Sequence, residues 1–485
     1  MSERGVAYRR RTEEDRISFL PDHLLCQILS DVPTKTAVVT SVLSTRWRTI
    51  WLSTPVLNLH TDDFPNFTAL ASFISRFLDF SKDSSCLHKL KLALRSERPI
   101  QELWKFALKS AYLDPSYLIT QWINNAVKLQ HLDIIFSYPW NAEMMPLSIY
   151  TCVTLVSLKL HSVSLADSEY VSLPCLKIMH LVDNVYASDA FLEKLISSCP
   201  VLEKLEVVTY EEDSEYDIRV LRVRSKSLTS LVVDLHGNNY MDSEDTVKAV
   251  VIDAPGLTYL NLEDHQSTSF VISKLSLSAE VSVNVSFDIA FDTDVIDSSK
   301  RSAVRNLFTM LSTIRGMSLC EITLQVCIIS LYLKHEPLPQ FPYLIWFRAY
   351  FCNSDLGKLP NILQSFPNLK SLVLDLEEFK VNEVLILSSS SIPACLRSSL
   401  ECVEIRTPIR GAVAEIELVK YFLENSAVLK KLKLCLRRGR MNEESNILME
   451  LLRLRRCSPS CEVVVDLEEL GEGTCQSMKR YYNFF

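Results

Sequence analysis

The segment from Asp15 to Leu57 reads DRISFLPDHLLCQILSDVPTKTAVVTSVLSTRWRTIWLSTPVL, and its helix signals decide the N-terminal fold. Pro21 suits the first turn of a helix, where its missing N–H is no loss, and Asp22 complements the positive end of the helix dipole. Pro33 ends this helix. The apolar residues recur at a spacing that places them on one face: Leu24, Leu25, Ile28 and Leu29.

Two further helices are expected after Pro33. Thr34 is predicted to cap the second helix, and Ser44 to cap a third that holds Trp47 and Trp51. About forty residues cannot form a large core, so three such helices leave apolar surface exposed. The segment is then either a module that docks on another protein or the first helical part of a larger globule. The spacing alone leaves both readings open.

The same segment resembles the F-box, the motif through which substrate receptors join cullin-based ubiquitin ligases, and in particular its plant form. The matching residues are Asp15–Ser18, Leu20–Asp22, Leu24, Leu25, Ile28, Leu29, Pro33–Lys35, Ala37, Thr40–Ser44, Arg46–Arg48 and Trp51. The resemblance implies that a Skp-type adaptor binds the apolar face and links the chain to cullin and RING subunits. The residues that it implies for the adaptor contact are Leu20, Pro21, Leu24, Ile28, Leu29, Val42 and Trp47.

Beyond this segment the pattern L-x-x-L-x-L recurs with conservative replacements. Copies begin at Leu87, Leu129, Leu155, Leu176, Leu202, Leu228, Leu257, Leu319, Leu344, Leu369, Leu400 and Leu429. Most intervals lie in or near the roughly 20–29-residue period of leucine-rich repeats. The long interval after Leu257 predicts a degenerate copy around Val281, Val283 and Val285. The pattern favours an irregular α/β solenoid, with parallel strands on its concave face, over an ordinary α/β domain with leucine-rich strands.

Helices are expected between several of these strands, over residues 187–198, 299–314 and 355–365. Two of them run into proline, at Pro200 and Pro367, which stops a helix before the next strand. The position after the motif often holds Asn or Cys in such repeats. Here only three copies have one there: Asn184, Cys327 and Cys352.

Strand pleating buries the first, fourth and sixth motif positions and exposes the third, fifth and seventh. The copy that begins at Leu344 thereby exposes Trp346, Arg348 and Tyr350, residue types enriched at binding hot spots. Trp346 and Tyr350 would alternatively pack beneath the domain that follows. The copy that begins at Leu202 is expected to expose Val208. Two further candidates for target binding come from other copies: Tyr259 and Glu321.

The C-terminal part adds one more strand–helix–strand unit, with a helix expected over Glu415–Asn425. Such a unit would cap the exposed end of a solenoid core. The stretch resembles the FBD domain that follows leucine-rich repeats in plant F-box proteins. The matching elements are Cys395, Leu396, Ser399–Glu401, Val403–Ile405, Glu417–Asn425 and Val428–Leu432. Basic residues between Lys430 and Arg456 lack interleaved aromatics, which favours a solvated face over a nucleic-acid surface.

Composition excludes several function classes. The net charge is −8, which gives no pull toward nucleic acid or anionic membrane, and only nine glycines leave no Gly-rich phosphate cradle. No apolar run reaches the roughly 18–20 residues that span a bilayer. Fourteen cysteines stand singly, without zinc spacing or a signal peptide, so we expect reduced thiols in the cytoplasm and/or nucleus. No catalytic motif appears, so we expect a non-catalytic protein without cofactor or metal.

The sequence thus predicts five parts: a basic tail over 1–14, an F-box over 15–60, irregular leucine-rich repeats over 61–390, an FBD-like domain over 391–465, and a C-terminal tail over 466–485. The predicted function is a substrate receptor of a Skp–cullin–F-box ubiquitin ligase, with an unknown protein target on the repeats. Two alternatives stay open. One is a binding module that acts outside a ligase, and the other is a leucine-rich-repeat receptor for a small molecule.

Overall fold

A computed structural model describes residues 17, 19–81, 87–94, 119, 121–124, 128–136, 145–209, 218–235, 248–273, 275–287, 298–332, 337–377, 379, 385, 387, 392–437 and 441–467. The predicted tails, 1–14 and most of 466–485, lie outside these residues. The chain forms two compact units, Met1–Ala187 and Ser188–Phe485, which are described one at a time.

The first unit begins with the three predicted helices. They are α1 (Asp22–Ser30), α2 (Thr34–Val39) and α3 (Trp47–Ile50), with 3₁₀ turns η1 (Thr40–Val42) and η2 (Trp51–Ser53) after the last two. Their shared core consists of Leu25, Leu29, Ala37, Trp47 and Ile50. Leu25 and Leu29 come from one face of α1, as the apolar spacing predicted, because they lie one turn apart.

Both predicted caps after Pro33 are wrong. The Thr34 hydroxyl accepts the backbone N–H of Asn58 at 2.8 Å and does not cap α2. Helix α3 begins at Trp47, so Ser44 stands outside its first turn. At that end Arg46 instead donates from its guanidinium Nε to the Asp22 carboxylate at 2.8 Å, which joins the start of α3 to the start of α1.

Parallel strands follow in the first unit. Their order is β1 (Val56–His60), β2 (Lys89–Leu94), β3 (His131–Phe136), β4 (Ser157–His161) and β6 (Ile178–Val182). Helix α4 (Phe67–Ser81) lies between β1 and β2, η3 (Thr61–Asp63) and η4 (Leu147–Thr151) are short turns, and β5 (Ser164–Leu165) pairs with β7 (Val185–Tyr186). Leucines of neighbouring strands stand opposite each other, as Leu90 and Leu132 do. Stacked rows of this kind build the apolar core of a repeat array.

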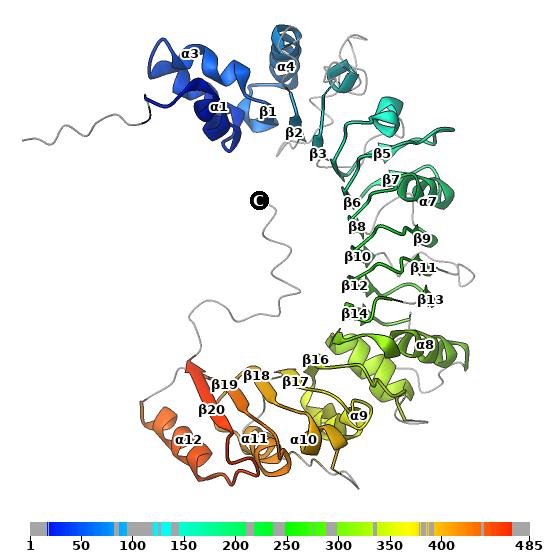
Figure 1. Cartoon of the computed structure of the whole chain (residues 1–485), viewed down its shortest axis with the longest axis vertical. Coiled ribbons are helices and arrows are strands. Elements are labelled where there is room, and N and C mark those ends of the chain that lie inside the picture. Colours follow the sequence, from blue (N-terminus) through cyan, green and yellow to red (C-terminus); the bar gives the residue numbers. More distant parts are fainter. Residues whose placement is uncertain are drawn as a thin grey trace, which may run out of the picture. The chain divides into compact units, whose positions relative to one another are not determined.

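The second unit continues the architecture with a longer parallel ladder (Figure 1). Its strands are β8 (Lys204–Thr209), β10 (Ser230–Leu235), β12 (Tyr259–Asp264), β14 (Glu280–Val285), β15 (Gly316–Leu319), β16 (Trp346–Phe351), β17 (Ser371–Leu376), β18 (Cys402–Ile409), β19 (Lys431–Leu436) and β20 (Glu462–Leu467). A second parallel sheet, in the order β13 (Ser269–Ile272), β11 (Ala249–Asp253), β9 (Val220–Arg224), lies among the earlier repeats of this unit.

The second unit also contains helices. They are α7 (Asp189–Ser197), α8 (Ser298–Met310), α9 (Leu359–Leu363), α10 (Ala394–Ser398), α11 (Val413–Asn425) and α12 (Met441–Arg453), with 3₁₀ segments η5 (Leu311–Thr313) and η7 (Asn353–Lys358) and a π-helical segment η6 (Thr323–Tyr332). The three helices predicted between strands correspond to α7, α8 with η5, and η7 with α9. Ser188 caps α7 by accepting the Phe191 N–H at 3.1 Å.

The degenerate repeat predicted around Val283 is confirmed as β14, whose Val281, Val283 and Val285 are buried. The next copy was placed in the wrong register. Leu319 ends β15 and pairs with Ala349, so it occupies the sixth motif position and not the first. The true copy begins at Ile314, whose side chain is buried, and the leucine pattern concealed this because Ile and Met take the first and fourth positions.

Polar side chains close several repeats where a strand ends. Asn184, buried after β6, donates to the carbonyl of Leu160 and accepts the N–H of Val163, each at 3.0 Å. Thr323 serves the end of β14 by accepting the Val285 N–H at 2.7 Å. Asn184, at the position after the motif, therefore bonds the backbone of the preceding repeat. Cys327 lies within η6, and its buried thiol donates to the Val285 carbonyl at 3.4 Å, so it shares this strand end with Thr323.

Candidate functional site

The three-helix module leaves apolar side chains uncovered although its own core is filled. Phe19 is 82% exposed and Val42 is 81% exposed, values typical of polar surface residues. Leu24 and Ile28 lie one turn apart on α1, so they share a face. The exposed apolar residues of this surface are Ile17, Phe19, Leu24, Ile28, Val39, Val42 and Leu43. Exposed large apolar side chains gathered in one short module mark an interaction surface.

The residues predicted for adaptor contact divide into three groups. Leu24, Ile28 and Val42 are exposed and available to a partner, and so is Pro21. Leu29 and Trp47 are only 4% and 6% exposed, so the prediction that they touch an adaptor directly is corrected: they pack in the core beneath the surface. Leu20 is half-buried against that core.

The residues predicted for adaptor contact leave out four members of the surface: Ile17, Phe19, Val39 and Leu43. Helical periodicity could not identify them. Ile17 and Phe19 precede α1, and Leu43 follows the η1 turn, so helical periodicity does not apply to these three residues. Val39 lies in α2 directly beside the half-buried Val38, and a helix of this length gives periodicity too few turns to decide which valine is inside.

The module is fixed to the first repeat of its own unit. The Trp51 ring stacks on the rings of Phe73 and Phe77 of α4, with centroids 6.2 Å apart in both pairs. Lys35 of α2 forms an ion pair with Asp63 at 3.1 Å. The N–H of Asn58 in β1 also donates to the Thr34 hydroxyl. The three-helix module thus contacts β1, η3 and α4, and these contacts hold its exposed surface in one orientation.

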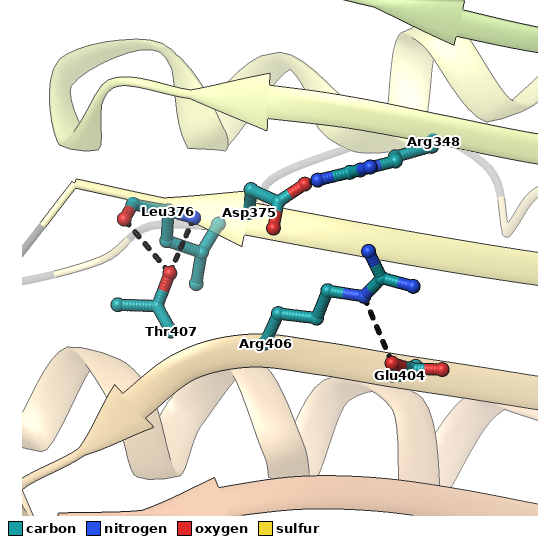
Figure 2. A network of polar contacts seen from close by, with 6 residues as sticks. All are labelled: Arg348, Asp375, Leu376, Glu404, Arg406 and Thr407. Atoms are coloured by element: carbon teal, nitrogen blue, oxygen red, sulfur yellow. Dashed lines mark hydrogen bonds and ion pairs between the residues drawn. The ribbon is translucent and has the colours of Figure 1, made fainter. Parts of the chain in front are cut away.

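The second candidate surface is the exposed face of β16 to β19. Trp346, Arg348 and Tyr350 alternate with the buried Phe347, Ala349 and Phe351, so their predicted outward orientation is confirmed. All three are half-buried. Arg348 donates to the Asp375 carboxylate of β17 at 2.6 Å, as Figure 2 shows. Its charge is therefore compensated within the face, which a sequence reading of hot-spot residues does not reveal.

Ion pairs continue across the neighbouring strands. Glu404 of β18 accepts from Arg406 at 2.9 Å and lies 3.8 Å from the Lys433 ammonium of β19 (Figure 2 draws the first). Glu401 pairs with Lys430 at 2.8 Å, and this hydrogen bond together with the lysine charge lowers the pKa of the Glu401 carboxyl. Several basic residues of the C-terminal part thus have acidic partners within the chain.

The other predicted target-binding residues lie elsewhere. Tyr259 is half-exposed on β12, as expected. Glu321 was predicted on a strand, but it follows β15 in a helical turn, because the register of that copy was misread. It accepts a hydrogen bond from the Cys352 thiol at 3.0 Å. Val208 was expected to be exposed and is instead buried.

The described residues hold no cluster of three or more His, Cys, Asp or Glu side chains that could bind a metal. Burial raises the pKa of the Cys199 and Cys395 thiols to about 12, so both are protonated at neutral pH and poor nucleophiles. Among these residues no helix combines the length and apolarity needed to cross a bilayer.

Models of known families match three segments of the chain. An F-box domain model matches residues 17–59, an FBD model matches residues 388–434, and a model of the leucine-rich repeats of the FBD-associated F-box protein At5g56370 matches residues 119–284. The chain is 56% identical to the putative F-box/FBD/LRR-repeat protein At5g22670 of Arabidopsis thaliana over 96% of this chain and 100% of that protein. The chain belongs to the plant F-box/FBD/LRR-repeat protein family.

Two more relatives from Arabidopsis thaliana support this membership. F-box/FBD/LRR-repeat protein At5g22660 is 48% identical, and F-box/LRR-repeat protein 13 is 41% identical; each match covers 96% of this chain and 99% of the relative. Proteins of this F-box/LRR class are generally non-catalytic adaptors, and an F-box implies a Skp-type adaptor as partner. The three-helix module with its exposed apolar surface is the F-box, and the parallel ladder contains the repeats and part of the FBD.

Proposed function

We propose that this protein is the substrate-recognition subunit of a Skp–cullin–F-box ubiquitin ligase. The observation that carries the proposal is the exposed apolar surface of the F-box, from Ile17 to Leu43, above a core that is already closed. A partner that covers these side chains would gain about 25 cal/mol for each Å² of apolar area removed from water. The F-box would dock on the Skp-type adaptor, which links it to the cullin and RING subunits.

The exposed face of the strands would hold the protein target. Trp346 and Tyr350 offer aromatic area beside the Arg348–Asp375 pair, a combination suited to a partner with both apolar and polar groups. The gain in rate would come from proximity, because tethering raises the concentration of target lysines near the charged conjugating enzyme. The division into F-box 15–60, repeats 61–390 and FBD-like domain 391–465 is part of the same proposal.

Co-purification with the Skp-type adaptor tests the docking step. The variant Val42→Asp with Leu43→Asp should abolish adaptor capture, because two carboxylates would have to be buried against apolar groups. Both positions are exposed, so the fold should survive. The matched control is Leu147→Asp with Val153→Asp, which alters two exposed apolar residues outside the F-box of the same unit.

Three results would bear on the proposal. Loss of capture in the F-box variant alone supports it. Full capture by that variant would contradict the assignment of the surface. Capture of the adaptor without the cullin would instead favour the alternative, a binding module that acts outside a ligase.

A further inference from the structure

The first strand of the first unit and the last strand of the second unit differ at their outer edges. The outer edge of β1 is covered by the F-box, where the Thr34 hydroxyl accepts the Asn58 N–H at 2.8 Å. Strand β20 pairs with β19 on one side and with no further strand among the described residues. A strand edge with unpaired backbone groups is a template for an added strand.

The pairing with β19 determines which backbone groups of β20 lie at the open edge. Glu462 donates its N–H to the Lys430 carbonyl at 2.9 Å. Successive residues of a strand direct their backbone groups to opposite sides, so Val463, Val465 and Leu467 direct theirs away from β19. In the described part of the chain no hydrogen bond reaches these groups. The two valines are half-buried and Leu467 is exposed, so an incoming backbone can approach them.

The core-facing side chains of β20 are also less covered than those of its neighbour. In β19 the residues on this face are at most 2% exposed: Leu432, Leu434 and Leu436. The register places Val463, Val465 and Leu467 beside them, yet the valines are half-buried and Leu467 is 49% exposed. In a repeat array the next repeat covers such residues. The described chain therefore leaves this end of its apolar core open.

Helix α12 exposes further apolar side chains in the same terminal repeat. It directly precedes β20 in the chain and lies at the same end of the unit (Figure 1). Ile447 and Leu451 are buried, whereas Leu448, Met449 and Leu452 are exposed, the last by 69%. Large apolar side chains that gather at one exposed place mark an interaction surface.

The opposite face of β20 determines the charge of a suitable partner. Glu462 and Asp466 are both exposed, and neither forms an ion pair among the described residues. Glu462 stands opposite Lys431 of β19 without an ion pair, and Asp466 stands opposite Cys435. A second copy of β20 is disfavoured as the added strand, because it would bring two more carboxylates to this face. A strand with lysine or arginine at alternate positions complements it.

We propose that the outer edge of β20 binds an extended segment of a partner protein, with alternating apolar and basic residues, as an added strand. The backbone of the segment bonds to Val463 and Val465. Its apolar side chains cover these valines and Leu467, and its basic side chains lie beside Glu462 and Asp466. Main-chain bonds supply affinity, and the alternation supplies specificity. This site uses neither the F-box surface nor the ion pairs of β16 to β19.

A peptide of defined composition tests the charge preference. The probe is a fluorescent peptide of about six residues, roughly 20 Å when extended, in which valine alternates with lysine. A second peptide has glutamate in place of every lysine. Fluorescence anisotropy with the full-length chain should show binding of the lysine peptide at least tenfold tighter than that of the glutamate peptide. Equal affinity for both peptides would overturn the proposal, and so would no binding of either, the result expected if another part of the chain covers the edge.

A proline substitution tests the mode of binding. Val465→Pro removes an N–H that points away from β19, so it should weaken the lysine peptide at least tenfold while β20 keeps its bonds to β19. The matched control Val465→Thr retains the N–H and should bind within about twofold of the unaltered chain. Urea denaturation should give similar stability for both variants. Unchanged peptide binding in Val465→Pro would contradict strand addition.

Charge reversal locates the site independently of the backbone. Glu462→Lys with Asp466→Lys should weaken the lysine peptide at least tenfold. The control Glu417→Lys with Glu424→Lys makes the same charge change at exposed positions of α11 and should have a much smaller effect. Equal losses in the two double variants would refute placement at β20.

Sedimentation velocity of the peptide-free chain distinguishes a second copy from a different partner. Val465→Pro should leave the sedimentation coefficient unchanged, because the edge is then free of other copies. A shift to a slower species in this variant would contradict the proposal, since a second copy would then occupy the edge.

Discussion

The F-box surface exposes apolar side chains, whereas the exposed face of β16 to β19 carries charged side chains that pair with one another. On the F-box, apolar residues such as Phe19 and Val42 stand in solvent with no partner side chain to cover them. On the strands, Arg348, Glu404 and Lys433 already have ion-pair partners. An apolar surface suits one constant partner that seals it, whereas a face of balanced charges and aromatics can select among partners without attracting any charged molecule. The difference therefore matches the two tasks that we propose.

The largest expected effect separates the F-box core from its surface. Trp47→Ala should lower the free energy of unfolding of this module by about 3–5 kcal/mol, because it leaves a cavity among Leu25, Leu29 and Ile50. Val42→Ala, at an exposed position, should change it by less than about 0.5 kcal/mol. Urea denaturation followed by tryptophan fluorescence and circular dichroism measures both. A small effect of Trp47→Ala would show that the core is not where the structure places it.

The next effect concerns the buried bonds that close a repeat. Asn184→Ala should lower the free energy of unfolding by about 2 kcal/mol, because it leaves the Leu160 carbonyl and the Val163 N–H buried without a partner. Thermal and chemical denaturation give the value. Asn58→Ala is a useful comparison, since Asn58 contributes only its backbone N–H to the bond with Thr34, which the substitution retains. Equal losses would argue against the role of the Asn184 side chain.

A smaller effect sharpens the contrast at the strand face. A double-mutant cycle with Arg348→Met and Asp375→Asn should give a coupling energy of at most about 1 kcal/mol, because both side chains remain about a fifth exposed. The coupling should fall as salt concentration rises. A double-mutant cycle in which Val42 and Leu43 of the F-box are replaced by alanine should give a coupling energy that does not depend on salt. A coupling that does not respond to salt would mean that water does not reach the pair.

The smallest effect is a response to pH at the first strands. Burial lowers the pKa of His131, and the charges of Lys89 and His88 lower it further. Because the folded pKa lies below the unfolded value of about 6.5, His131 contributes stability above pH 6.5 that is lost as pH falls through its folded pKa. Lys89→Gln should raise the pKa of His131 in an NMR titration. Lys91→Gln, which alters a neighbouring cation, should leave it almost unchanged.

The sequence predicted elements whose signals are local. Pro21 and Pro33 bounded α1, and the spacing of Leu202, Leu205 and Val207 identified β8 with its buried face. The β14 repeat was recognisable because valine alternates as regularly as leucine does. In such segments one period explains both the element and its buried side.

Predictions failed where a tertiary contact overrode a local preference. Threonine often caps helices, but the hydroxyl of Thr34 accepts the backbone N–H of Asn58 instead. Glu321 was misplaced because Leu319 belongs to the end of its motif, and only the pairing with β14 and β16 fixes the register. Leu29 and Trp47 look like surface anchors in the motif, yet the decision between core and surface depends on how α1 and α3 pack.

Strand β1 has a consequence for exchanging parts between relatives. All of β1 except its last residue, His60, lies within the range matched as F-box, yet the strand pairs residue by residue with Lys89–Ala93 of β2. A chimera joined at the end of the F-box match would separate β1 from β2, the strand with which it pairs. A cut after Ser81 would keep the Trp51 ring with the rings of Phe73 and Phe77 but would still separate β1 from β2. A cut after Leu94 transfers the F-box together with α4, β1 and β2.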